Sequence, residues 1–142
     1  MDFVEAATGG RPLLTDGGIE TRIMFGSDYE MDPHLQVAAM VDDERGGPLI
    51  RGVYERYVGA AEAAGVSIVI GTPTFRASAN FAAAAGRPRA AVDELNARAA
   101  AMHAGLRDRA SVAVFVAGVL GPARDAYTPA RALGVEEAHE YH

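Results

Sequence analysis

Asp16 is the residue of this sequence with the clearest potential for ligand chemistry. It comes directly after the short apolar segment 12–15 and is followed by Gly17 and Gly18. A carboxylate can accept hydrogen bonds from the ammonium group of a ligand, and two glycines let the backbone approach that ligand closely. The pattern predicts a binding site, although Asp-Gly-Gly also occurs in plain turns.

A second group of polar residues follows the apolar segment 66–70. Thr72, Thr74 and Ser78 offer hydroxyl groups to a ligand, and Phe75 offers an apolar wall. A purely structural interpretation stays open for Thr72, Thr74 and Phe75. The threonines could satisfy backbone groups beside Pro73, and Phe75 could belong to the core.

A third apolar segment, residues 112–116, leads into Gly118 and Gly121, which we interpret as turn glycines. Each of the three loops therefore follows a segment that is apolar enough to form a buried strand. In parallel sheets, binding sites form at the carboxyl ends of the strands. We expect the three loops to lie along one edge of a sheet.

Helices must connect these strands, and the apolar spacing predicts them. The expected strands are 12–15, 66–70 and 112–116, and the expected helices are 48–64, 78–85, 90–107 and a helix from 135 onward. This alternation predicts an α/β fold with a parallel sheet. The nearly continuous β-branched run in the second strand predicts burial on both of its faces.

Apolar residues three and four positions apart predict which side of each long helix faces the core. In the first long helix they are Leu49, Ile50, Val53, Tyr57, Ala60, Ala61 and Ala64. In the second they are Val92, Leu95, Ala99, Met102 and Leu106. His103 is expected on the polar side or at the boundary of its helix, and Ser78 is expected to cap the short helix that follows it.

Composition excludes several classes of function. The 142 residues include no cysteine, so they form no disulfide, thiolate nucleophile or thiolate-bound zinc. The net charge of -6 argues against nucleic acid and anionic membranes as partners. No apolar stretch approaches the ~20 residues of a membrane-spanning helix, so we expect a cytoplasmic protein. His139 and His142 have a spacing that could hold a metal on a helix, but a solvated helix face is the favoured interpretation.

Taken in order, the loop motifs resemble those of the homocysteine S-methyltransferase family. The matching segments are 13–21 (LLTDGGIET), 57–78 (YVGAAEAAGVSIVIGTPTFRAS) and 116–122 (VAGVLGP). The resemblance implies a TIM barrel that transfers a methyl group from a small donor to the thiol of homocysteine, or of a similar thiol amino acid. It also implies a zinc ion that holds this thiol as a thiolate. Asp16 matches the acid near the substrate amino group, and the other positions implied in substrate binding are Gly17, Gly18, Glu20, Thr21, Thr72, Thr74 and Phe75.

The zinc ligands of that family are cysteines in Asn-Cys and Cys-Cys motifs near later strands, and neither motif occurs here. We therefore assign no catalytic and no metal-binding residue to this chain, and expect zinc only in a full-length protein. A TIM barrel needs about 250 residues and eight strands. Three strands predict that residues 1–142 are the N-terminal part of a barrel, truncated at its C-terminal end.

Two other interpretations remain open from the sequence. The chain could be a non-catalytic α/β half-barrel that acts as a binding or assembly module, which the missing cysteines favour. It could also be a different barrel enzyme that uses Asp16 in phosphate or carbonyl chemistry. Because a three-stranded sheet leaves unpaired edges, we further expect the isolated chain to self-associate.

Overall fold

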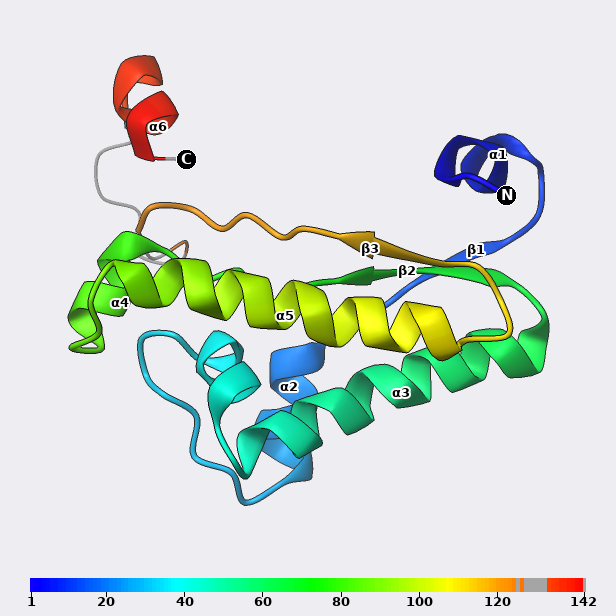
Figure 1. Ribbon diagram of the computed structural model, residues 1–142, viewed down its shortest axis with the longest axis horizontal. Helices are drawn as coiled ribbons and strands as arrows, with labels where there is room; N and C mark the ends of the chain where they lie inside the picture. Colours follow the sequence, from blue (N-terminus) through cyan, green and yellow to red (C-terminus); the bar gives the residue numbers. More distant parts are fainter. Residues whose placement is uncertain (125, 127–132, 142) are drawn as a thin grey trace.

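Three parallel strands form the single sheet of the residues that the structure describes, which are 1–124, 126 and 133–141 of this computed structural model. They are β1 (Leu13–Thr15), β2 (Ser67–Gly71) and β3 (Val114–Ala117), in the spatial order β1-β2-β3 (Figure 1). In register, Leu14 lies beside Ile68, which lies beside Val114. The prediction of a parallel α/β fold is confirmed, and the arrangement is consistent with part of a TIM barrel.

Helices connect the strands, and the two longest cover one face of the sheet (Figure 1). The predicted helices correspond to α3 (Gly46–Ala64), α4 (Ala79–Ala84), α5 (Ala90–Arg109) and α6 (Val135–Tyr141). Three further elements were not predicted: α1 (Phe3–Thr8), α2 (Ile19–Gly26) and the 3₁₀ helix η1 (Val37–Asp42). Within the part of the chain that the structure describes, every helix is too short or too polar to span a membrane.

The helix α1 begins with a signal that the sequence does carry. Asp2 accepts a hydrogen bond from the backbone N–H of Glu5, and the Glu5 carboxylate accepts one from the backbone N–H of Asp2, both at 2.8 Å. This reciprocal arrangement is a capping box, and an acid three residues before a glutamate is its sequence pattern.

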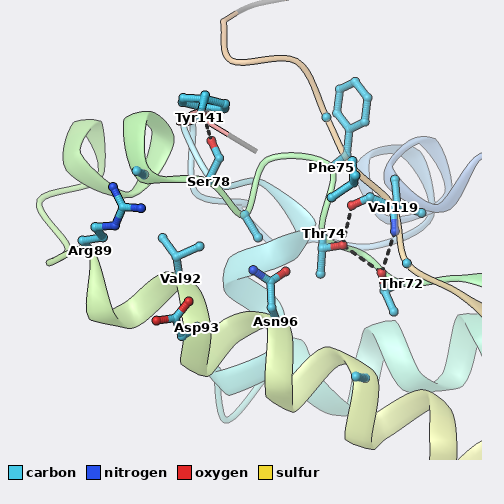
Figure 2. A pocket seen from close by; sticks show the side chains of 16 residues that line it. Thr72, Thr74, Phe75, Ser78, Arg89, Val92, Asp93, Asn96, Val119 and Tyr141 are labelled. Carbon is cyan, nitrogen blue, oxygen red and sulfur yellow. Dashed lines mark hydrogen bonds between the residues drawn. The ribbon is translucent and has the colours of Figure 1, made fainter. Parts of the chain in front are cut away.

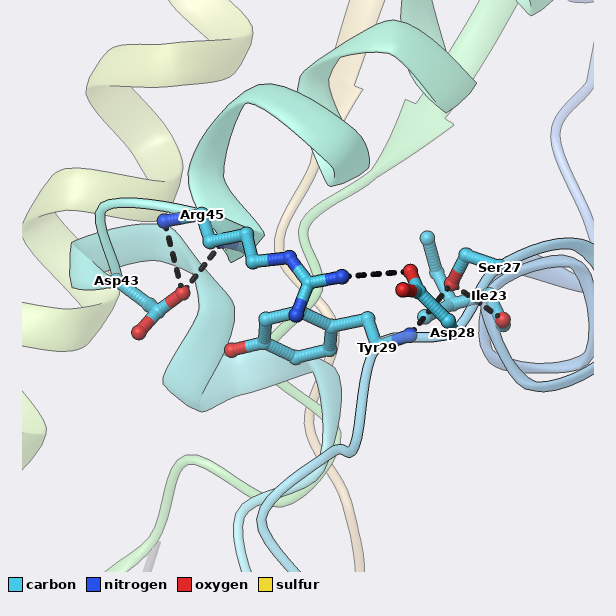
Figure 3. Close-up of polar contacts among 7 residues, drawn as sticks. Ile23, Ser27, Asp28, Tyr29, Asp43 and Arg45 are labelled. Atoms are coloured by element: carbon cyan, nitrogen blue, oxygen red, sulfur yellow. Dashed lines mark hydrogen bonds and ion pairs between the residues drawn. The ribbon is translucent and has the colours of Figure 1, made fainter.

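The start of α3 is held by the acidic segment that precedes it (Figure 3). Asp43 accepts hydrogen bonds from the backbone N–H groups of Arg45 and Gly46, and these bonds lower the pKa of the Asp43 carboxyl. Arg45 also reaches back to Asp28, with 2.6 Å between guanidinium nitrogen and carboxylate oxygen. The acidic segment before α3 thus satisfies N–H groups that have no partner within the helix.

The main core lies between α3, α5 and the sheet. It confirms Ile50, Val53 and Ala61 on the predicted face of α3 and corrects the edges of that face. Tyr54 and Val58 are buried, whereas Ala60 and Ala64 are exposed. The helix is rotated so that its larger side chains face the sheet, because burying them removes more apolar surface from water than burying alanines does. The core residues include Ile50, Val53, Tyr54, Val58, Ala61, Ile68, Ile70, Met102, Leu106 and Val114.

The prediction that β2 is buried on both faces is wrong. Ile68 and Ile70 are buried, but Ser67, Val69 and Gly71, which alternate with them, are only partly covered. The long helices lie on one face of the sheet, while on the other α1 contributes the edge-to-face contact of Phe3 with Phe115, at 5.4 Å between ring centres. The composition of β2 is typical of a strand that is covered on both faces, but among the described residues the long helices cover only one face.

Candidate functional site

Asp16 lies one residue beyond β1, at the carboxyl edge of the sheet, by which we mean the edge where the three strands end. Its backbone N–H donates to Val69 O at 3.2 Å and so extends the strand pairing by one residue. Its carboxylate Oδ2 accepts a hydrogen bond from the backbone N–H of Gly71 at 3.0 Å. Burial raises the pKa of Asp16, while the hydrogen bonds from Gly71 and from its own N–H oppose that rise. The side chain is thus half-buried and held at the end of β2.

The carbonyl of Gly71 faces two side chains from the long helices. Tyr54 donates its hydroxyl proton to Gly71 O at 2.8 Å, and His103 Nε2 lies 3.0 Å from the same oxygen. The other ring nitrogen of His103, Nδ1, lies 3.1 Å from Ala99 O. The expected place of His103 at a polar boundary is wrong: its side chain has no exposed surface. It can be buried as a neutral ring because a carbonyl oxygen lies within reach of the one nitrogen that carries its proton.

His103 should make stability depend on pH. Burial lowers the pKa of this imidazole, and the hydrogen bonds to Gly71 and Ala99 oppose the shift. An unfolded histidine titrates near pH 6.5, so below that pH the unfolded chain binds more protons than the folded one. The free energy of unfolding should therefore fall as the pH falls from about 6.5 through the folded pKa, by at most ~1.4 kcal/mol per pH unit for one proton.

Urea unfolding at several pH values checks this expectation, with His103→Gln as the matched variant because glutamine does not titrate. The difference in free energy of unfolding between the two proteins should change between pH 7 and pH 5. A constant difference over that range would contradict the assignment of a neutral, buried His103.

Thr72 and Thr74 tie the loop after β2 to the loop after β3. Thr74 donates its hydroxyl proton to Val119 O at 2.8 Å, and Thr72 Oγ1 accepts the N–H of Val119 at 3.0 Å. The two hydroxyl oxygens are 2.8 Å apart. Because the proton of Thr74 is used on Val119, the hydroxyl of Thr72 must be the donor between them. Both threonines thus satisfy backbone groups of Val119 in another loop, whereas the structural interpretation of the sequence placed those groups beside Pro73.

The glycines after Asp16 form the turn into α2. Gly17 O accepts a hydrogen bond from the Tyr57 hydroxyl, and Gly18 has a φ of 58°, a left-handed conformation that suits glycine. Glu20 and Thr21 follow in the first turn of α2, where Glu20 is half-buried and Thr21 is exposed. These residues lie on the β1 side of the carboxyl edge.

A cavity of about 380 Å³ lies between the loops after β2 and β3, the start of α5 and the end of α6 (Figure 2). Thr72, Thr74 and Phe75 line it, whereas the other predicted residues, from Asp16 to Thr21, do not. The structure therefore divides the predicted residues into two groups, one around Asp16 and one around this cavity. Ser78, whose hydroxyl the sequence analysis also noted, lines the cavity as well, and the polar lining residues that it missed are Arg89, Asp93, Asn96 and Tyr141.

Two features of the sequence concern these polar lining residues. Arg89, Asp93 and Asn96 are spaced by four and three positions, which places them on one side of a helix. Ser78 stands at the N-cap position of α4, as predicted, but its side chain makes no capping hydrogen bond. Its oxygen instead accepts the hydroxyl proton of Tyr141 at 2.7 Å, a contact with α6 that no local pattern indicates.

The comparison with known families decides the relationship. A family model described as homocysteine S-methyltransferase matches residues 13–142. The chain belongs to the homocysteine S-methyltransferase family. The match confirms the resemblance of the loop motifs, and it starts at β1 and contains every predicted binding residue. Neither the curated proteins nor the solved structures include a match to this chain.

The zinc that the homocysteine S-methyltransferase family implies does not fit the residues of this chain. The sequence has no cysteine, and the described residues contain no group of three or more His, Asp or Glu side chains that could hold a metal ion. His142, one of the two histidines considered as a metal pair from the sequence, lies outside the described residues. We derive no chemical step through zinc from this part of the domain.

Proposed function

We propose that this chain supplies the amino-acid-binding part of a site that methylates the thiol of homocysteine or of a similar thiol amino acid. The observation that carries the proposal is the half-buried carboxylate of Asp16, held by Gly71 at the carboxyl edge of the sheet. Among the described residues, no cationic side chain forms an ion pair with it. Asp16 is thus available to the ammonium group of an amino acid.

The electrostatics of Asp16 support this role. A charge-assisted hydrogen bond between ammonium and carboxylate is stronger in a partly desolvated site than in water. Burial raises the pKa of the free carboxyl, and a bound ammonium would lower it again. Ligand binding and ionisation of Asp16 therefore favour each other.

The proposal gives this chain binding residues and no catalytic residue. Zinc in this family would require ligands beyond these 142 residues, which include no cysteine. The neighbouring residues proposed to line the substrate site are Gly17, Gly18, Glu20 and Thr21 beside Asp16, and Thr72, Thr74 and Phe75 at the cavity. The methyl donor is a second small-molecule partner of the proposed complete site.

Asp16→Asn tests the proposal because asparagine keeps an acceptor for the Gly71 N–H and removes the charge. Homocysteine affinity of the 142-residue chain, measured by isothermal titration calorimetry, should fall at least about tenfold, which is ~1.4 kcal/mol. Asp108→Asn, an exposed carboxylate at the far end of α5, is the matched control and should leave the affinity unchanged.

A ligand without the amino group, 4-mercaptobutyrate, sharpens the test. It should bind the unmodified chain and Asp16→Asn equally, because it has no ammonium group to pair with the carboxylate. Equal homocysteine affinity in both proteins would remove Asp16 from the proposed role. Absence of homocysteine binding at millimolar concentration would overturn the proposal for this chain.

The uncovered face of the sheet favours a second candidate function, that of a non-catalytic half-barrel binding or assembly module. Among the described residues, β1 and β3 each pair on one side only, and the face that carries Val69 and Phe115 is partly exposed. Such edges favour association with another chain. Analytical ultracentrifugation would support this candidate by showing a defined oligomer that binds neither zinc nor homocysteine, and a monomer that binds homocysteine would contradict it.

A further inference from the structure

Gly71 lies where three elements meet. It is the last residue of β2 and lies beyond the end of β1, because the pairing of these two strands stops where Thr15 lies beside Val69. Its N–H bonds the side chain of Asp16, and its carbonyl faces Tyr54 of α3 and His103 of α5. Beyond the end of β1, side chains therefore replace the neighbouring strand as hydrogen-bond partners of the Gly71 backbone.

The packing leaves little room around this residue. A Cβ on Gly71 would lie 2.9 Å from Val119 Cγ2 and 3.8 Å from Asp16 Oδ1. A separation below 3.0 Å forces a shift of the neighbouring atoms. The absence of a side chain therefore makes room for Val119 of the loop after β3, while the carboxylate of Asp16 lies at ordinary contact distance.

The protons at the Gly71 carbonyl follow from its partners. Burial and the charges of Asp16 and Glu20 raise the pKa of Tyr54, so its hydroxyl stays protonated and donates. A neutral imidazole has one N–H. Ala99 O lies within α5, where the helix provides a backbone donor. Gly71 O has no donor from β1, and its two lone pairs can accept from Tyr54 and from a second donor. We therefore expect His103 to carry its proton on Nε2 and donate it to Gly71.

We propose that Tyr54 and His103 are positioning residues, which act together as a clamp on the Gly71 carbonyl and thereby aim the carboxylate of Asp16 at the ligand. The proposal rests on the proposed role of Asp16 in binding an amino acid. Both clamp residues are fully enclosed, with 1% and 0% of their surfaces exposed, and their rings meet edge to face at 4.3 Å. They act through the backbone and do not touch the ligand themselves.

Paired substitutions of His103 separate the clamp from simple packing. In His103→Gln, the amide nitrogen can stand where Nε2 stands and can still donate to Gly71. In His103→Asn, the shorter amide reaches only the position of Nδ1. The asparagine variant should lose about fivefold in homocysteine affinity, which corresponds to one net hydrogen bond, while the glutamine variant should keep most of the affinity.

Tyr54→Phe removes the second donor and should lower the affinity by a similar factor. Tyr29→Phe is its matched control, because the hydroxyl of Tyr29 interacts with Asp43 before α3 and takes no part in the clamp. In Tyr54→Phe and His103→Asn, the amide proton signal of Gly71 should shift. The pKa of Asp16, followed by carbon-13 NMR of its carboxyl, should rise further because the Gly71 N–H supports it less. A merely structural role would lower stability in these variants and leave the pKa of Asp16 unchanged, which would overturn the proposal.

Nitrogen-15 NMR of the unmodified chain tests the clamp without any substitution. The expected result at neutral pH is a His103 ring protonated on Nε2 and unprotonated on Nδ1. A ring protonated only on Nδ1 would present a lone pair to Gly71 O and would overturn the role of His103. These signals do not require homocysteine, so a failure of homocysteine binding would leave the clamp testable. Conversely, full affinity in His103→Asn and Tyr54→Phe, with loss in Asp16→Asn, would overturn the clamp alone.

Discussion

Replacing Gly121 with alanine is expected to destabilise the chain by about 3 kcal/mol, the upper part of the usual range for overpacking. A Cβ at this position would lie 1.7 Å from the carbonyl oxygen of Phe75. That oxygen belongs to the backbone, so the clash cannot be relieved by rotating a side chain. The loops after β2 and β3 would have to separate, and the cavity that both loops line would open.

Urea unfolding followed by circular dichroism measures this effect, and Gly118→Ala provides the control. Gly118 lies in the same loop, but a Cβ there meets no atom within 4 Å. The control should change the free energy of unfolding by less than about 1 kcal/mol. Equal stability of the two variants would contradict the close contact between Gly121 and Phe75.

Removal of the hydroxyl group from Thr74 is expected to cost about 1–3 kcal/mol, because its partners become buried groups without a hydrogen bond. Thr74→Val keeps the shape of the side chain and leaves the Val119 carbonyl and the Thr72 hydroxyl unsatisfied. Thr72→Val should have an effect in the same range, since the N–H of Val119 then loses its acceptor. Serine at either position keeps the hydroxyl and is the matched control.

A double-mutant cycle tests whether the two threonines act as one unit. The double valine variant should lose less stability than the two single losses added together, because the bond between the two hydroxyls is already lost in either single variant and is counted twice in the sum. The free energies of unfolding from urea titrations supply all four corners of the cycle. Strictly additive losses would show that the bond between the two hydroxyls contributes nothing to stability.

The local patterns predicted the scaffold of the site well. The apolar runs located all three strands of the described sheet to within two residues, and apolar spacing identified Leu95, Ala99, Met102 and Leu106 as buried residues of α5. These signals are strong because strand and helix periodicity depends on neighbours in the chain. Asp16 was selected for the same reason, since its type and its place directly after a strand are both local properties.

Local patterns did not predict which groups the buried polar side chains contact. His103 is an isolated histidine in a helix, and nothing within its own segment indicates that a carbonyl 32 residues away faces its ring. Tyr54 was not among the apolar positions predicted for α3, although it lies one turn from them, and its hydroxyl also reaches Gly71. Burial of such polar groups depends on a matching acceptor in another element, which only the packing of α3 and α5 against the sheet provides.

The sequence by itself determined the alternation of strands and helices, the family, and the presence of a carboxylate after the first strand, because each follows from residue type and short-range order. Only the tertiary structure decided that Asp16 bonds Gly71, 55 residues away, and that the threonines and Phe75 line a separate cavity. It also decided that β2 is covered on one face. These outcomes depend on the register of the strands and the rotation of the helices about their axes, which are set by contacts between distant segments.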